Sequence, residues 1–377
     1  MSMLRKLAVK ALCAVTPIQK NRVVFSNFGG LGYSDSPKAI CEVLRKSGED
    51  LELLWICKDE AAAASLPEGV QAVPAQGIQK KRALASSKVW VDNCRKYEFI
   101  KRKNQFYLQT WHGFALKRIE ADVGNHLEAD YVAAAKGDSA QIDVIVTGSG
   151  FMEKLYRNSF WYEGPVLRTG TPRNDIFFRD HSALHAEVCK HFALPENRKL
   201  ALYAPTFRSD HSTEAYRIDA ELVRRKAAEN FKGDWTVLIR LHPNVAAQSA
   251  ELFAYNGDTL VDATEYPDMA ELLCAADLLI SDYSSAMFDY ALTGKPVIQF
   301  ATDIEAYQKD RNFYFPLDAL PFPLARSNEE LERVLTELQP LWTSPAWAEF
   351  ARENDFCEDG EAAVRCAALI LQQMKKK

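Results

Sequence analysis

The chain of 377 residues is long enough for two domains, and its 47% hydrophobic and 26% charged residues are typical of a globular protein with sizeable cores. A formal net charge of −5 argues against a nucleic-acid-binding protein. Eight scattered cysteines without a Cys-x-x-Cys pair favour a reducing cytoplasm over a disulfide framework, and no apolar run approaches the length that spans a bilayer.

Residues 1–20 predict a short basic amphipathic helix at the N-terminus. Lys10 interrupts its apolar part and strand-like sequence follows Pro17 almost at once, so the segment differs from a signal peptide. Two interpretations stay open for this helix. It lies on a membrane surface, or it packs on its own domain.

Strands and helices then alternate along the chain. Apolar segments predict strands at 22–26, 51–57, 89–92, 106–110, 143–147, 166–168, 200–204, 235–240, 260–262, 278–280 and 296–300. A helix is expected from Ser36, with Pro37 at its first position, and a terminal helix at 361–374. This alternation favours parallel α/β sheets in two domains, 21–180 and 181–377, with the polar run at 179–198 as the linker region.

The junction after the strand at 278–280 predicts an anion-binding site. Asp282, Ser284 and Ser285 lie where this strand meets a helix predicted at 284–292. A helix N-terminus behind a parallel strand offers unpaired N–H groups to a phosphate. Asp289 follows on the same helix, where it can accept hydrogen bonds from ribose hydroxyls. Together they predict a nucleotide-linked donor, and the alternative is a well-capped helix with a solvated Asp289.

Two histidines lie just past predicted strands, one in each half of the chain. His112 follows the strand at 106–110, and His242 follows the strand at 235–240. Parallel α/β folds place their working residues at this carboxyl edge, and histidine is the natural general base near neutral pH. We expect the pair to converge on one interdomain cleft. The alternative for each is a hydrogen-bonded structural histidine.

Arginines at sharp turns form a third group of candidates. Arg173 precedes Asn174 and Asp175 in a Gly-Thr-Pro-Arg-Asn-Asp turn, while Arg208 follows another predicted strand and Arg240 ends a third. Guanidinium groups suit a diphosphate that gains charge as a bond breaks. No grouping with metal-ligand spacing stands out in the sequence. Cationic side chains and a helix dipole are therefore expected to do what a metal does elsewhere.

Residues 80–103 form a local basic patch in this acidic chain. Such a patch suits anionic lipid head groups or a polyphosphate acceptor, although a charge run is more often a solvated face. The residues expected to make this contact are Lys80, Lys81, Arg82, Lys101, Arg102 and Lys103.

Several short motifs occur together in the order found in one protein family. They lie at 25–38, 109–113, 170–175, 203–208, 240–243, 281–285 and 359–360. Through them the chain resembles, nearly end to end, the CDP-glycerol glycerophosphotransferase family, the teichoic-acid primases and polymerases of bacterial envelopes. The resemblance implies a GT-B-like fold, in which two Rossmann-like domains with parallel sheets face an interdomain cleft that holds the donor.

Members of that family transfer a polyol phosphate from a CDP-linked donor to a hydroxyl of a lipid-linked acceptor and release CMP. The resemblance thus implies a peripheral enzyme at the cytoplasmic face of the membrane that needs no cofactor. His112 and His242 fall on the family's two essential histidines. Its donor contacts fall on Arg173, Arg208, Ser284, Ser285 and Asp289.

Two other functions stay open: a GT-B glycosyltransferase that uses a nucleotide sugar, and a non-catalytic binding subunit of an envelope-polymer complex. The presence of His112, His242 and Asp289 argues against the non-catalytic binding subunit. The sequence leaves open whether the polyol is glycerol, ribitol or a rarer one, and which acceptor receives how many units. It also leaves open which of the two histidines is the general base.

Overall fold

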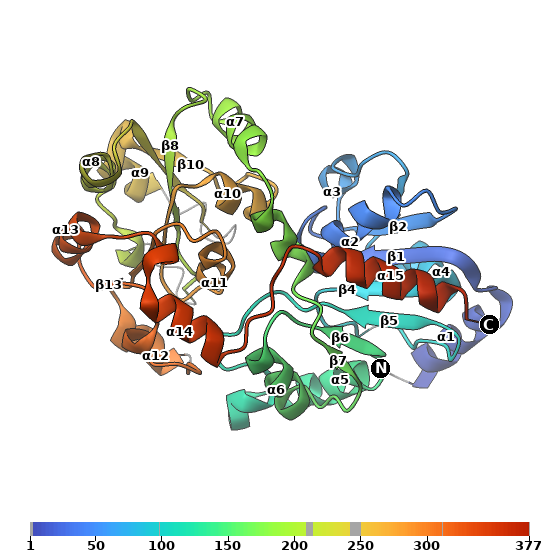
Figure 1. Ribbon diagram of the computed structural model, residues 1–377. Coiled ribbons are helices and arrows are strands. Elements are labelled where there is room, and N and C mark those ends of the chain that lie inside the picture. Colours follow the sequence, from blue (N-terminus) through green and yellow to red (C-terminus); the bar gives the residue numbers. More distant parts are fainter. Residues whose placement is uncertain (1–2, 98, 209–213, 242–249, 311, 377) are drawn as a thin grey trace. The chain divides into compact units, whose positions relative to one another are not determined.

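The computed structural model describes residues 3–97, 99–208, 214–241, 250–310 and 312–376, and the chain forms two compact units, each built on one parallel sheet (Figure 1). The first unit comprises Met1–His112, Ile119–Asp175 and Asp355–Lys377. The second comprises Gly113–Arg118 and Ile176–Asn354. The predicted α/β class with two parallel sheets is confirmed.

Parallel strands form the 7-stranded sheet of the first unit in the order β3-β2-β1-β4-β5-β6-β7. Their bounds are β1 (Gln19–Ser26), β2 (Glu52–Cys57), β3 (Val70–Pro74), β4 (Ser87–Asp92), β5 (Phe106–Gln109), β6 (Val144–Val146) and β7 (Val166–Leu167). The order reverses between β1 and β4, which is the topological switch point of a doubly wound sheet. Loops that follow β1, β4 and β5 therefore meet at one edge.

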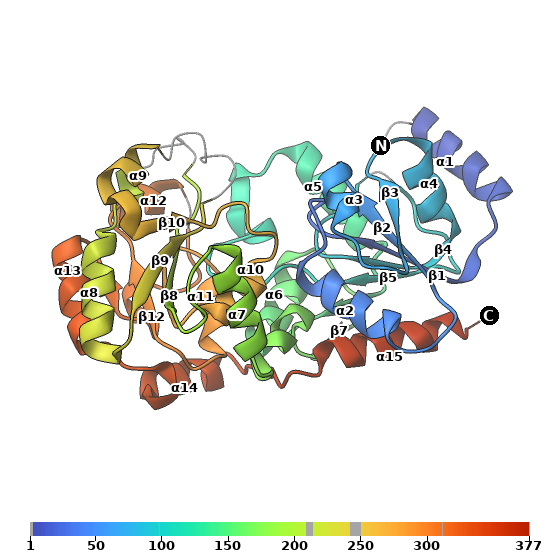
Figure 2. The ribbon, with the colours of Figure 1, turned by 90° about the horizontal axis from the view of Figure 1, so that it is seen from above.

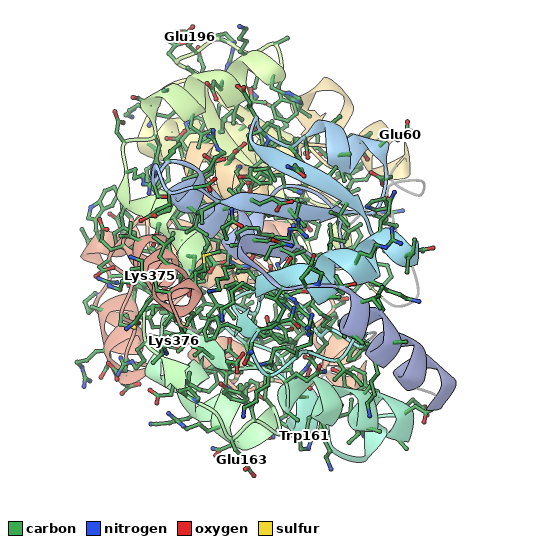
Figure 3. All side chains as sticks on the ribbon, turned by 90° about the vertical axis from the view of Figure 1, so that its right-hand side faces the viewer. Glu60, Trp161, Glu163, Glu196, Lys375 and Lys376 are labelled. Atoms are coloured by element: carbon green, nitrogen blue, oxygen red, sulfur yellow. The ribbon has the colours of Figure 1, made fainter. Side chains whose placement is uncertain are left out.

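The first unit also contains helices, several of which pack against this sheet. Its helices are α1 (Met3–Val15), α2 (Asp35–Arg45), α3 (Glu60–Ala64), α4 (Gly77–Ser86), α5 (Ala129–Ser139), α6 (Gly150–Ser159) and α15 (Ala362–Met374). The helices α2 and α15 lie side by side (Figures 1 and 2) and share a core with β1, β2 and β4, and Lys375 and Lys376 follow α15 (Figure 3). The predicted N-terminal helix is α1, and it packs against α4.

The second unit repeats the design with a 6-stranded sheet in the order β10-β9-β8-β11-β12-β13. Its strands are β8 (Lys199–Ala204), β9 (Trp235–Ile239), β10 (Leu260–Asp262), β11 (Leu278–Ser281), β12 (Val297–Phe300) and β13 (Leu324–Ala325). The switch point lies between β8 and β11. Loops after these two strands are the expected place for a ligand of this unit.

Helices cover both faces of the second sheet (Figure 2). Their bounds are α7 (Ser182–His191), α8 (Ala220–Phe231), α9 (Ala250–Asn256), α10 (Met269–Ala275), α11 (Ala286–Ala291), α12 (Ile304–Asp310), α13 (Asn328–Glu337) and α14 (Pro345–Glu353). Val223 of α8 and Leu331 of α13 are fully buried in one core with β9 and β11, while α10 packs on α7 and β8.

A short segment from the first half of the chain, Gly113–Arg118, belongs to the second unit. The Phe114 ring lies 4.5 Å from that of Phe288, centroid to centroid, and Arg118 N–H donates to the Asn312 carbonyl over 2.8 Å. The amide of Tyr314 donates in turn to the Leu116 carbonyl over 2.9 Å. These contacts begin directly after His112, the last residue of the first unit's opening segment.

The structure differs from the sequence-based expectations at several places. β3 and β13 were not predicted, and both are edge strands. Residues 179–198, expected as a linker region, contain α7 of the second unit, and 355–377, expected in the second domain, cluster with the first unit. Within the residues that the structure describes, no helix is both long enough and apolar enough to cross a bilayer.

Candidate functional site

His112 lies at the carboxyl edge of the first sheet, just past β5. Its Nδ1 is 2.7 Å from the backbone oxygen of Asn93, which follows β4. A ring nitrogen that faces a carbonyl oxygen carries the proton, so Nδ1 donates and Nε2 keeps its lone pair. Among the described residues, none is within hydrogen-bonding distance of Nε2. The ring is thus arranged to accept a proton at Nε2.

The ring of His112 is half-buried between two aromatic side chains. It stacks on Trp111 with centroids 4.2 Å apart, and the Phe28 ring lies 5.5 Å away. Burial is the largest influence and lowers the pKa of His112 below its usual 6.5, while the Asn93 carbonyl and Asp35 oppose this shift. The imidazole is therefore neutral near pH 7, which is the state that a general base requires.

Arg173 belongs to the same cluster, but through the backbone of His112. Its Nη1 donates to the His112 carbonyl over 2.8 Å and to Asp35 Oδ2 over 2.7 Å. The Asp35 backbone has a φ of +62°, in the left-handed region that costs a non-glycine residue about 1 kcal/mol. The sequence pointed to Arg173 as a phosphate ligand and missed Asp35, whose only signal was its place in a family motif.

The residues after Arg173 hold the C-terminal segment. Both carboxylate oxygens of Asp175 accept the first amides of α15, from Ala362 over 3.0 Å and from Ala363 over 2.7 Å. The Asn174 Nδ2 donates to Glu358 Oε1 over 3.3 Å. Asn174 and Asp175 are both buried. The structure gives them a capping and anchoring task, and the donor contact predicted for them stays a prediction.

In the second unit, Asp282 joins the loops on either side of the switch point. It follows β11 and accepts hydrogen bonds from Thr206, which follows β8, at the backbone N over 2.8 Å and at Oγ1 over 2.5 Å. The Tyr283 amide donates to it as well, over 2.6 Å. Asp282 is only 1% exposed. Its carboxylate therefore fixes the geometry of the edge, and its predicted contact with the donor stays a prediction.

Arg208 lies in the same network. Its Nε and Nη2 donate to the two carboxylate oxygens of Asp303 over 2.6 and 2.9 Å, and Nη2 lies 2.9 Å from Asp282 Oδ2. The guanidinium is 4.9 Å from the ring centroids of both Tyr283 and Tyr307. Because its donors are engaged and the residue is 6% exposed, Arg208 connects the ends of β8, β11 and β12. The sequence did not single out Asp303.

Ser284, Ser285 and Asp289 lie on the loop and helix after β11. The Ser284 hydroxyl accepts the Ala286 amide over 3.2 Å, so it starts α11, two residues later than predicted. The hydroxyl of half-buried Ser285 has no hydrogen-bond partner among the described residues. Asp289 lies on α11 and is 6% exposed. Ser285 is thus the residue of this group best placed to bind a further hydrogen-bonding partner.

Arg240 follows β9 and is half-buried, and burial lowers the pKa of its guanidinium. Its Nη1 is a buried donor without a hydrogen-bond partner among the described residues. Such a group fits an anionic ligand. His242 lies outside the described residues. The predicted convergence of the two histidines therefore stays a prediction.

The predicted basic patch separates into two parts. Lys101 Nζ lies 2.7 Å from Asp143 Oδ2, and Arg102 Nη1 donates to the Thr16 carbonyl over 2.6 Å, so both have internal partners. Exposed basic residues are Lys81 and Arg82 on α4 and Lys103 in the following loop, while Lys80 is half-buried. The predicted contact with anionic lipid stays a prediction.

Comparison with known proteins adds to this geometry. The profile of the family described as CDP-Glycerol:Poly(glycerophosphate) glycerophosphotransferase matches residues 8–372. The teichoic acid poly(glycerol phosphate) polymerase of Staphylococcus epidermidis is 30% identical over 343 residues, which cover 85% of this chain and 47% of that protein. The teichoic acid glycerol-phosphate transferase of Staphylococcus aureus is 28% identical over 368 residues, covering 94% and 93%.

Among solved structures, that of the wall teichoic acid polymerase TagF has a TM-score of 0.84 and 27% sequence identity, covering 99% of this chain and 94% of that one. The doubly wound parallel sheets of the two units and this likeness confirm the GT-B-like fold that the resemblance implied. The chain spans about half the length of the first curated relatives it matches, 47% and 44%.

Proposed function

We propose that this chain, which belongs to the CDP-glycerol:poly(glycerophosphate) glycerophosphotransferase family, transfers a polyol phosphate from a CDP-activated donor to a hydroxyl of a lipid-linked acceptor. Glycerol phosphate is the first choice for the transferred group. The observation that carries the proposal is the state of His112. Its Nδ1 proton is donated to Asn93, its pKa is lowered by burial, and Nε2 is left as a proton acceptor.

The proposed step uses His112 as the general base. Nε2 takes the proton of the acceptor hydroxyl while that oxygen attacks the phosphorus that carries the polyol. The bond from this phosphorus to the bridging oxygen breaks, and CMP leaves with that oxygen and its electron pair. Holding the two reactants in line supplies much of the acceleration in phosphoryl transfer.

The second unit supplies the donor contacts in this proposal. The unpartnered Nη1 of Arg240 and the Ser285 hydroxyl are groups that can bind the phosphates as charge develops on the leaving CMP. Arg208 and Asp282 act indirectly, because they fix the loops that carry these groups. His242 is proposed as the second essential histidine, from its place in the Arg-Leu-His-Pro motif.

Relatives support the choice of donor. The Staphylococcus epidermidis and Staphylococcus aureus relatives are named for glycerol phosphate chemistry. A structure of a TagF variant soaked with CDPG has a TM-score of 0.84 to this chain at 27% identity. A CDP-linked polyol is therefore the first donor to supply.

The test is nucleotide release by the purified protein. CDP-glycerol, CDP-ribitol and a UDP-sugar are each incubated with a lipid-linked disaccharide, and CMP and UDP are measured with and without the acceptor. CMP release that depends on the acceptor is expected with CDP-glycerol. Release of UDP alone would contradict the proposal and indicate a glycosyltransferase. Release of neither CMP nor UDP with any of the three donors would favour a non-catalytic binding subunit.

A variant pair assigns the base in the same assay. His112→Ala is expected to lower kcat by roughly a hundredfold or more, the usual loss of a general base. The exposed His126 provides the control, since His126→Ala should keep normal turnover. Normal turnover of His112→Ala would remove His112 from the mechanism.

Peripheral contact with the cytoplasmic face of the membrane is part of the proposal. It is supported by the exposed Lys81 and Arg82 on α4, while the packing of α1 on α4 agrees with the other interpretation of the N-terminal helix, that it packs on its own domain. The variant Lys81→Gln/Arg82→Gln should bind anionic vesicles roughly 30-fold more weakly, since each basic residue contributes about 1 kcal/mol at such a surface. A second variant, Arg333→Gln/Arg352→Gln, removes two exposed charges elsewhere and should leave sedimentation unchanged. Equal losses in both variants would contradict a defined contact surface.

A further inference from the structure

The loop between β1 and α2 is firmly held although it contains three glycines. The amides of Gly30 and Leu31 both donate to the Asn27 carbonyl, over 2.7 and 3.0 Å, and the Gly30 carbonyl accepts the Lys58 amide over 2.9 Å. A Cβ at Gly30 would lie 2.9 Å from Lys58 N, so no side chain fits there. The Trp55 Nε1 donates to the Gly32 carbonyl over 3.2 Å. These hydrogen bonds anchor the loop to β2 and to Lys58, the residue that follows β2.

This loop exposes apolar side chains. Phe28 is 39% exposed and Leu31 is 62% exposed. The Phe28 backbone has a φ of +43°, in the left-handed region that disfavours bulky residues. Backbone strain in a well-anchored loop is often found at functional sites. The exposed part of the Phe28 ring is available to a ligand.

Asn93 positions both Phe28 and His112. Its side-chain Oδ1 accepts the Phe28 amide over 2.9 Å, and its backbone oxygen accepts His112 Nδ1 over 2.7 Å. Asn93 is fully buried, and its Nδ2 donates to Asn27 Oδ1 over 2.7 Å. The 5.5 Å separation of the Phe28 and His112 ring centroids is therefore set by one rigid residue at the switch point of the first sheet.

We infer that Phe28 is a specificity-determining residue that stacks on a sugar ring of the acceptor, next to the hydroxyl that reacts. This inference rests on the proposed function, in which the acceptor hydroxyl lies within hydrogen-bonding distance of His112 Nε2. Because the Phe28 and His112 ring centroids are 5.5 Å apart, the carbon skeleton that carries the hydroxyl is then a neighbour of the Phe28 ring. A sugar ring presents a flat C–H face that covers an aromatic ring, whereas a charged polyol-phosphate end does not.

The experiment measures CMP release against two acceptors, a lipid-linked disaccharide and the same acceptor ending in glycerol phosphate. Phe28→Ala is expected to raise the KM for the disaccharide roughly tenfold, with kcat and the KM for the CDP-linked donor changed less than about twofold. The KM for the polyol-phosphate-ended acceptor should change little. Phe28→Tyr, which keeps the ring, should recover most of the affinity for the disaccharide.

Phe178→Ala is the matched control, because Phe178 is 44% exposed and belongs to the second unit. Equal KM changes for the two acceptors, or a loss confined to kcat, would overturn the inference. Thermal unfolding of each variant checks that the fold is retained, and Phe28→Leu, which is apolar but has no aromatic ring, takes the place of Phe28→Ala if that variant does not fold.

A binding measurement separates this inference from the proposed function. Saturation-transfer NMR with the soluble disaccharide reports ring contact without turnover. Contact in the wild type and in Phe178→Ala that is lost in Phe28→Ala supports the stacking role even if no CMP is released. Equal contact in all variants, or no contact in the wild type, overturns it.

Discussion

At the scale of single residues, a backbone oxygen determines the protonation of the candidate base. The Asn93 carbonyl accepts the Nδ1 proton of His112, and burial keeps the ring neutral. The Asp35–Arg173 pair holds the His112 backbone from the other side, with side chains that are 8% and 12% exposed. The residue types follow from the sequence, but the tautomer follows only from the position of Asn93.

The lowered pKa of His112 predicts the pH dependence of the reaction. Below the pKa the ring is protonated and cannot act as a base, so kcat/KM should fall as pH drops through it. Because burial places the pKa of His112 below 6.5, activity should persist to pH values under 6.5. A pH profile between 5 and 9, together with NMR titration of the His112 ring, measures both quantities. An acidic limb centred above 6.5 would contradict the prediction.

Asp35→Asn tests the positioning of the base. The negative charge of Asp35 raises the pKa of His112, so its removal should move the acidic limb of kcat/KM to lower pH. The looser hold of Arg173 on the His112 carbonyl should also lower kcat, roughly tenfold. Asp180→Asn removes an exposed carboxylate of the second unit as the control. If the acidic limb of kcat/KM stays at the same pH in Asp35→Asn, Asp35 has a structural role only.

At the scale of elements, the attachment of α15 depends on a buried cap. Asp175 accepts the first two amides of α15, although the two segments lie 187 residues apart along the chain. Glu358 adds bonds to the Thr171 amide over 2.8 Å and to Asn174 over 3.3 Å. The helix was predicted from its apolar pattern at 361–374, but its docking beside α2 in the first unit was not.

Asp175→Ala is expected to lower the free energy of unfolding by about 2 kcal/mol, because two buried amides lose their acceptor. Denaturant unfolding followed by circular dichroism measures this change. Asp359→Ala is the matched comparison: Asp359 accepts the Glu361 amide over 3.1 Å but is solvent-exposed, so its loss should cost under about 1 kcal/mol. Equal costs would show that burial of the cap does not matter.

The pattern of apolar residues did not detect the edge strands β3 and β13, although it did detect the edge strands β7 and β10. β3 exposes three of its five residues, and β13 has only two residues. A strand at the edge of a sheet is paired on one side, so it needs less apolar surface than a central strand. The central strands β1, β4, β8 and β11 each contain a run of at least three apolar residues, which is why the sequence predicted them.

At the scale of the whole molecule, the chain order and the division into units do not coincide. Gly113–Arg118 is part of the second unit although it is flanked on both sides by segments of the first. Phe114 packs in an aromatic cluster with Phe288, Phe315 and Phe350. The residue after the candidate base is thus the start of a segment anchored in the other unit.

Phe114→Ala should destabilise the second unit by about 3–5 kcal/mol, the usual cost of removing a buried phenylalanine. Amide hydrogen exchange should become faster in α11 and α14, which contribute Phe288 and Phe350 to the cluster. Exchange in β1 and β2 of the first unit should change much less. Faster exchange confined to the first unit would contradict the assignment of this segment, and Phe178→Ala serves as the control for loss of an exposed phenylalanine.

The sequence by itself determined the α/β class, most central strands, the family and the candidate residue types, because periodicity and motifs are written along the chain. Only the tertiary structure decided the partners of those residues. Asn93 meets His112 across 19 positions, Asp35 meets Arg173 across 138, and Asp175 meets Ala362 across 187. A buried polar group must find a partner wherever the fold brings one, and that choice depends on strand order and helix docking, which no local pattern encodes.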